Sequence, residues 1–122
     1  MKNKEIKVLM ASAEISPFAK VGGLADVVGS LPPAMKKIGV DVRLIMPKYG
    51  SIDDKEYKLE IIYKNIKVPS ATSLQTIDIY LGHLPNTNIP VYFIDNKKYF
   101  SKKEVYWGND SERFSFFCLS VI

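Results

Sequence analysis

The segment Lys20-Val21-Gly22-Gly23-Leu24-Ala25-Asp26 combines a positive charge, two adjacent glycines and a carboxylate. Glycine lets a backbone come close to a ligand and adopt a positive φ. The free N–H groups at the start of a helix attract anions, and Lys20 adds a full positive charge beside them. The combination suits a pyrophosphate group. A Gly-Gly bend before a helix also occurs in α/β proteins that bind nothing there, so a purely structural role stays open.

The segment differs from both well-known phosphate-binding loops. The P-loop spacing G-x-x-x-x-G-K-[ST] is absent. The dinucleotide fingerprint G-x-G-x-x-G is absent as well, and the next predicted strand ends in Ile45-Met46-Pro47 instead of the acidic residue that would hold a ribose. These general motifs therefore do not identify the ligand.

The elements around the segment predict a β-α-β unit. The apolar run Ile6–Ala11 is short and rich in branched residues, which predicts a strand buried on both faces. Residues 12–23 break the periodicity and are expected to form a loop. Apolar residues then recur at steps of three and four over Leu24–Ile38, which predicts a helix that ends at Gly39, and Val40–Met46 gives the next strand. Ligands of open α/β sheets lie beyond the carboxyl ends of the strands, where this loop is placed.

Two prolines, Pro32 and Pro33, interrupt the predicted helix. A proline removes a backbone donor and clashes with the preceding turn, so we expect the helix to kink or restart there, with Ser30 as the cap of the second piece. The apolar positions that should share the buried face of the helix are Leu24, Val27, Val28, Leu31, Met35 and Ile38.

Three more strands and a second helix are predicted after residue 58. The strands are Leu59–Tyr63, Thr76–Leu81 and Val91–Ile94, and the alternation in the second predicts a half-exposed strand of an antiparallel hairpin. Ser111–Ile122 is predicted to be a helix capped by its serine. Its apolar face should contain Phe114, Phe117, Cys118 and Val121. The sequence stops within this apolar pattern, so we expect a fragment of a longer protein with a Rossmann-like open α/β sheet.

Composition and charge narrow the class of protein. The 122 residues are 47% apolar, which is enough for one domain or part of one. The net charge of +4 comes from lysines that lie beside acids, and no zinc-finger or RNA-binding signature is present, so we expect no nucleic-acid partner. No apolar stretch approaches the roughly 18 residues of a membrane span. Cys118 is the only cysteine in the sequence, so no intrachain disulfide can form and no oxidising compartment is required. This favours the cytoplasm.

Two stretches of the sequence carry specific motifs. The first consists of Ser12-Ala13-Glu14, Pro17, K-V-G-G-L-A-D-V with Gly29, Leu31 and Pro32, and G-V-D-V-R-L-I-M-P-K-Y up to Tyr49, and the second of Asn109-Asp110 with Arg113-Phe114. Both resemble the amino-terminal signature of bacterial glycogen synthases and plant starch synthases, although the second departs from the family's D-N-x-x-R-F element at its first two residues. The resemblance covers the whole chain and is specific mainly from Ser12 to Tyr49, because residues 55–99 match only in strand pattern.

The resemblance implies a GT-B fold, in which two Rossmann-like domains face each other across a cleft. Residues 1–122 would be the first part of the N-terminal domain, with the rest of that domain and the C-terminal domain absent. It also implies transfer of glucose from ADP-glucose to the non-reducing end of an α-1,4-glucan such as glycogen, with retention and with no metal or other cofactor. The family's catalytic histidine and basic pair have no counterpart here, so we expect no catalytic residue in this fragment and no activity from it alone.

The same resemblance implies four donor-binding residues. Lys20 would contact the ADP-glucose phosphates and stabilise the charge on the leaving diphosphate. Backbone N–H groups of Gly22 and Gly23 would approach the same phosphates or the glucose. Asp26 would hydrogen-bond the donor, although an acid in the first turn also stabilises a helix start by itself. Glu14 could bind sugar hydroxyls, with a solvated loop carboxylate as the alternative.

Two other functions stay open at this point. One is a non-catalytic Rossmann-like module that binds a nucleotide or a phosphosugar. The other is an interaction domain in which the Gly-Gly loop is purely structural. Unchanged affinity for ADP after Lys20→Ala would favour the interaction domain.

The remaining candidate residues favour structural roles. His83 lacks a partner acid or cysteine and is expected on the surface, in a turn. Asp53 and Asp54 are adjacent and not spaced to hold a metal-bound nucleotide. Cys118 is expected to be a small buried side chain. The aromatic residues Tyr99, Phe100, Tyr106 and Trp107 are expected to close a core or, alternatively, to border a glucan channel.

Overall fold

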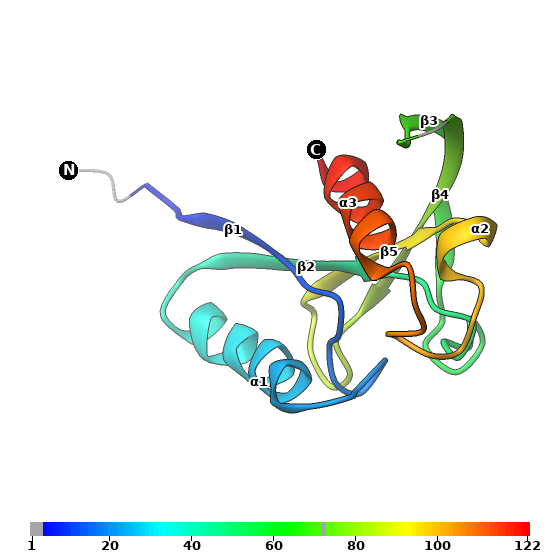
Figure 1. Ribbon diagram of the computed structural model, residues 1–122. Coiled ribbons are helices and arrows are strands. Elements are labelled where there is room, and N and C mark those ends of the chain that lie inside the picture. Colours follow the sequence, from blue (N-terminus) through cyan, green and yellow to red (C-terminus); the bar gives the residue numbers. More distant parts are fainter. Residues whose placement is uncertain (1–3, 72) are drawn as a thin grey trace.

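The predicted β-α-β unit opens the computed structural model, which describes residues 4–71 and 73–122 (Figure 1). It consists of β1 (Lys7–Ala11), α1 (Gly23–Lys37) and β2 (Asp41–Pro47). The two strands pair in parallel, with Lys7 opposite Asp41 and Ala11 opposite Ile45. Their carboxyl ends therefore lie at the same end of the sheet, and the loop that follows β1 begins there.

Three more strands complete the sheet that the described residues form. They are β3 (Glu60–Pro69), β4 (Leu74–His83) and β5 (Pro90–Asp95), and the strand order is β1-β2-β5-β4-β3. β5 is parallel to β2, whereas β4 is antiparallel to both β5 and β3. The predicted open α/β sheet and the predicted hairpin are both confirmed. β3 extends past the predicted end at Tyr63 because pairing with β4 continues beyond Asn65, whose φ of 57° and the register shifts around it interrupt the side-chain alternation.

The helix α1 runs from Gly23 to Lys37 without a break. The expected restart at Pro32 and Pro33 is wrong, and Ser30 lies inside the helix instead of capping a second piece. Pro32 is buried, so its ring contributes packing that offsets the backbone donor it lacks. The predicted stop is confirmed, because Gly39 has a φ of +90° and donates its N–H to the carbonyl of Lys36 at 3.0 Å.

The buried side of α1 differs from the predicted apolar face. The side chains that α1 buries are Ala25, Val28 and Pro32. Other apolar positions on the predicted face are exposed, namely Leu24, Val27, Leu31 and Ile38. β1 is also less buried than predicted, since Leu9 is 50% exposed and Val8 and Met10 are only partly buried. Lys7, Leu9 and Ala11 share one face of β1 and are all exposed, so none of the described residues covers that face.

Two helices follow the sheet. Sequence patterns did not indicate α2 (Lys97–Phe100), which Asn96 caps by accepting hydrogen bonds from the N–H groups of Lys98 and Tyr99. α3 (Asp110–Val121) begins one residue before the predicted start, after Asn109, so the predicted serine cap is wrong. Cys118 is exposed, which corrects the expectation that it is buried. Figure 1 shows α1 and α3 on opposite sides of the sheet.

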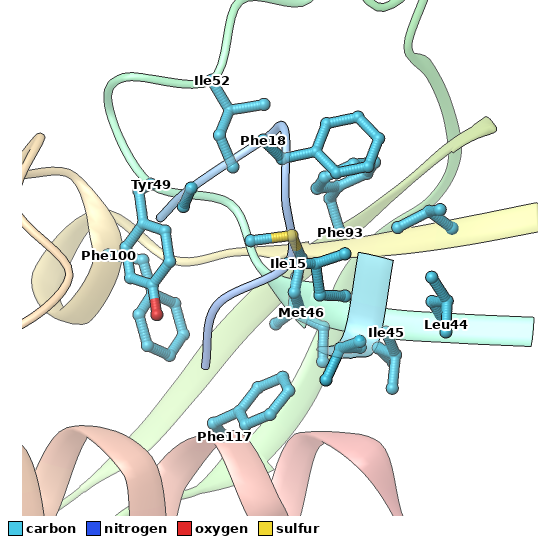
Figure 2. Packing of buried hydrophobic residues seen from close by; sticks show 14 of the residues in the cluster. Ile15, Phe18, Leu44, Ile45, Met46, Tyr49, Ile52, Phe93, Phe100 and Phe117 are labelled. Atoms are coloured by element: carbon cyan, nitrogen blue, oxygen red, sulfur yellow. The ribbon is translucent and has the colours of Figure 1, made fainter. Parts of the chain in front are cut away.

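The hydrophobic core joins the sheet to the loop after β1. Phe93 and Met46 of the central strands are fully buried, and Ile15 and Phe18 of the loop pack with them (Figure 2). The rings of Phe18 and Phe93 meet edge to face with centroids 5.0 Å apart. Fixing a loop in the core in this way limits its conformational freedom. The predicted core role of two aromatic residues, Tyr99 and Phe100, is confirmed.

Arg113 is a fully buried arginine at the centre of the C-terminal part of the chain. Its Nε donates to the carbonyl of Tyr99 at 2.7 Å, and its Nη1 donates to the carbonyl of Val105 at 2.8 Å. Nη1 also pairs with Asp110 Oδ1 at 3.0 Å, and the guanidinium lies 4.6 Å from the centroid of the Trp107 ring. Arg113 therefore ties α2 and the following loop to α3.

Candidate functional site

The loop between β1 and α1 is held by hydrogen bonds at the residues of the Ser-Ala-Glu motif. Ser12 donates its hydroxyl to the carbonyl of Glu14 at 2.7 Å, and the Glu14 N–H donates back to the same hydroxyl oxygen at 3.3 Å. Between them, the carbonyl of Ala13 accepts the hydroxyl of the fully buried Tyr49 at 2.5 Å. These contacts fix the backbone from which the Glu14 side chain projects.

The carboxylate of Glu14 lies at the N-terminal end of α1. Glu14 is only 3% exposed, so the alternative of a solvated loop carboxylate is wrong. Its Oε1 accepts three backbone N–H groups, those of Val21 at 3.4 Å, Gly22 at 2.9 Å and Ala25 at 3.3 Å. A negative charge at this position is favourable because it faces unpaired N–H groups and the positive end of the helix dipole. Glu14 therefore shapes the start of α1 and the loop before it.

The glycine pair leaves open space and free amides next to this carboxylate. Gly22 has φ −152° and ψ −159°, so the expected positive φ is not found, and its N–H is already bonded to Glu14. A Cβ added at Gly22 or Gly23 would meet nothing within 4 Å. Among the described residues, the N–H groups of Gly23 and Leu24 have no hydrogen-bond acceptor. These two amides, and not that of Gly22, are thus available to an anion.

Lys20 and Asp26 face each other across the start of α1. The Lys20 Nζ lies 2.9 Å and 2.8 Å from the two carboxylate oxygens of Asp26. Both side chains are about half exposed, at 53% and 52%, so solvent screens the pair and an incoming anion can reach the lysine. All five residues singled out from the sequence thus lie in one loop and the first turn of one helix.

The close approach of α1 to the loop requires glycine at position 29. A Cβ at Gly29 would lie 2.6 Å from the carbonyl oxygen of Ser16, which is closer than side-chain carbons come to backbone atoms. Near the start of the helix, the Ser16 N–H donates to the carbonyl of Ala25 at 3.0 Å. The helix and the loop therefore pack as one unit, which explains a glycine in the middle of a helix.

Sequence reasoning missed the role of Tyr106. Its hydroxyl donates to Oε2 of Glu14 at 2.9 Å, although the two residues are 92 positions apart. Tyr106 is 44% exposed and therefore does not close a core. Together with Ser51, residues 17–21 and 103–106 line a groove of about 460 Å³. No sequence pattern joins these segments, and the only available indication was the aromatic pair at Tyr106 and Trp107.

The Glu14 carboxylate gives stability a defined dependence on pH. Burial raises the pKa of Glu14, but hydrogen bonds from Gly22, Tyr106, Val21 and Ala25 outweigh it and leave the pKa below its ordinary value. Because this pKa is lower in the folded state than in the unfolded state, the ionised group stabilises the fold above the unfolded pKa. That contribution is lost as the pH falls through the folded pKa.

We expect the melting temperature of the complete natural protein to exceed that of its Glu14→Gln variant at pH 7, by a margin that narrows as the pH falls below about 4. The other carboxylates titrate equally in both proteins, so their contributions cancel in the difference between the two melting temperatures. Thermal melts in a pH series measure the margin. A margin that stays constant or widens toward acid pH would contradict the assignment.

The other candidates have separate structural surroundings. His83 is the exposed last residue of β4, not part of a turn as predicted. Asp53 caps a turn by accepting the Lys55 N–H at 2.8 Å, whereas Asp54 pairs with Lys48 at 2.7 Å.

Within residues 4–71 and 73–122, no three side chains of the metal-binding types form a cluster that could hold an ion. No helix in that same part of the chain is long and apolar enough to cross a membrane.

Two proteins named glycogen synthase are similar to almost the whole of this chain. Glycogen synthase from Thermosipho melanesiensis is 42% identical over 118 residues, which cover 96% of this chain and 24% of that protein. Glycogen synthase from Moorella thermoacetica is 43% identical, covering 98% of this chain and again 24% of the relative. The chain thus spans about a quarter of the length of these relatives.

A solved structure agrees with the fold over the same length. The catalytic domain of Starch Synthase IV from Arabidopsis thaliana, bound to ADP and acarbose, matches with a TM-score of 0.84 at 30% identity. The match covers 97% of this chain and 24% of that one, and it confirms an open α/β sheet of the kind found in a GT-B starch synthase. A family model described as the starch synthase catalytic domain matches residues 7–122. The chain therefore belongs to the starch synthase catalytic domain family.

Proposed function

We propose that this chain is the first part of the N-terminal domain of a glycogen synthase, which transfers glucose from ADP-glucose to the non-reducing end of an α-1,4-glucan with retention. The observation that carries the proposal is the set of anion-binding groups at the start of α1, where Lys20 lies beside the free N–H groups of Gly23 and Leu24. Relatives named glycogen synthase and a neighbour bound to ADP and acarbose support it.

In this proposal the donor diphosphate lies over the glycine pair. Lys20 leaves Asp26 to contact the phosphates, and the free amides of Gly23 and Leu24 add two hydrogen bonds without further rearrangement. Groups that are already oriented toward the leaving diphosphate stabilise the charge that grows on it during transfer. Gly22 contributes open space and not a hydrogen bond, because its N–H is held by Glu14. Asp26, released from Lys20, can accept a hydrogen bond from the donor.

In this proposal Glu14 can contact the glucose directly through only one of its two carboxylate oxygens. A carboxylate has about four acceptor positions on its two oxygens. Oε1 already accepts three N–H groups and Oε2 accepts the hydroxyl of Tyr106. Any sugar hydroxyl must therefore approach Oε2, on the side that Tyr106 leaves open.

The residues that perform the transfer are proposed to lie outside these 122 residues, so the chain alone is expected to be inactive. The acceptor is expected to be glycogen or a related glucan. The cytoplasm is the proposed location, supported by a single cysteine that has no partner for a disulfide.

Transfer of labelled glucose onto glycogen by the complete natural gene product tests this function. We expect incorporation from ADP-glucose to exceed incorporation from UDP-glucose, and we expect none from the 122-residue chain. Transfer mainly from UDP-glucose would overturn the donor assignment. No incorporation from either donor, with ADP still bound, would favour the non-catalytic nucleotide-binding module.

A further inference from the structure

Tyr106 connects two distant parts of the chain at the candidate site. It lies in the segment between α2 and α3, and its hydroxyl donates to Oε2 of Glu14 at 2.9 Å. The other oxygen of the same carboxylate accepts the N–H groups of Val21, Gly22 and Ala25. One carboxylate therefore links the Tyr106 hydroxyl to the backbone that carries Lys20 and Gly23.

The position of the second carboxylate oxygen matters because Glu14 is an anion at an anion-binding helix end. The free N–H groups of Gly23 and Leu24 lie in the same loop and helix start as the amides that Oε1 accepts. A carboxylate oxygen without a partner would be attracted to such free N–H groups. The Tyr106 hydroxyl instead gives Oε2 a donor, which holds this oxygen in place.

We propose that Tyr106 is a positioning residue for the diphosphate of the donor. It keeps Oε2 of Glu14 away from the free amides, so that Glu14 orders the loop without competing for the groups that the diphosphate needs. This inference rests on the proposed function, since it assigns a residue to the same donor site. Tyr106 lines the groove beside Lys20 and Val21, but the proposed role belongs to its hydroxyl and not to its ring.

The test uses Tyr106→Phe in the complete natural protein, because phenylalanine keeps the ring and removes only the hydroxyl. We expect the KM for ADP-glucose and the Kd for ADP to rise about tenfold, the effect of losing one hydrogen bond to a charged group. The kcat and the KM for glycogen should change less than about twofold. The matched control is Tyr92→Phe, whose hydroxyl accepts from Arg43 at 2.8 Å on the surface of the sheet, and which should leave donor binding unchanged.

A double-mutant cycle with Glu14→Gln shows whether Tyr106 acts through the carboxylate. Once the charge on Glu14 is removed, we expect Tyr106→Phe to raise the KM for ADP-glucose by less than about twofold. A full tenfold effect in the Glu14→Gln background would mean that the hydroxyl contacts the donor itself, which overturns the positioning role. A lower kcat and melting temperature with an unchanged KM would also overturn it, since that result indicates a purely structural tyrosine.

The proposed function and the role of Tyr106 fail in different ways. If the wild-type protein transfers no glucose and binds no ADP, the proposed function is wrong. If the wild-type protein transfers glucose and Tyr106→Phe binds ADP equally well, only the role of Tyr106 is wrong.

Discussion

Lys20→Ala in the complete natural protein is expected to lower kcat/KM for ADP-glucose ten-fold to a hundred-fold. In the proposed function the substitution removes a charge-assisted contact to the diphosphate, which would contribute about 1.5 to 3 kcal/mol. The amides of Gly23 and Leu24 remain, so residual binding is expected. The loss should not come from unfolding, because the Lys20–Asp26 pair is half exposed and contributes at most about 1 kcal/mol to stability.

Steady-state kinetics with varied ADP-glucose and saturating glycogen measure the effect, and calorimetry with ADP separates binding from transfer. Lys36→Ala is the matched control, because Lys36 lies in the last turn of the same helix, far from the loop. It should leave both donor KM and ADP affinity unchanged. Equal ADP affinity in Lys20→Ala and wild type would mean that Lys20 serves only as the partner of Asp26.

Of the substitutions named here, Arg113→Leu should destabilise the protein most. It should lower the free energy of unfolding by about 2 to 4 kcal/mol. Without the guanidinium, the buried carbonyls of Tyr99 and Val105 lose their donors, at roughly 1 to 3 kcal/mol each. The Nη2 group is buried and has no hydrogen-bond partner among the described residues. Removing this unpaired group is favourable and offsets part of the lost free energy of unfolding.

Arg43→Leu is the matched control for this substitution. Arg43 is half exposed, and its contacts to Tyr92 and Asp41 lie at the surface, so a change below about 1 kcal/mol is expected. Denaturant unfolding of both variants in the complete protein gives the comparison. Equal midpoints for Arg113→Leu and Arg43→Leu would show that Arg113 does not hold α2 and α3 together.

The sequence was sufficient to predict the β-α-β unit and the shared location of the candidate residues in one loop and helix start. Strand and helix periods, the glycine pair and Gly39 are local features, and each indicates a boundary without knowledge of the rest of the fold. Lys20 and Asp26 flank the start of one helix, so their proximity also follows from local geometry. Both predictions depended only on residues close together in the chain.

The sequence was not sufficient where distant segments meet. Tyr106 and Glu14 come together only through the packing of the segment between α2 and α3. The burial of Arg113 depends on the carbonyls of two other segments, which no side-chain pattern reveals. α1 carries apolar residues on more than one side, so its periodicity predicted a helix but did not select the side that packs on the sheet.

The Lys20–Asp26 pair should make donor affinity less sensitive to ionic strength. Asp26 serves as a built-in counterion for Lys20. A diphosphate that takes the lysine exchanges one ion pair for another, so the number of close charge contacts changes little. Added salt screens the exposed resident pair as well as the incoming anion, since the Debye length is about 8 Å at physiological ionic strength. Donor affinity should therefore fall less steeply with salt than it would at an unpaired lysine.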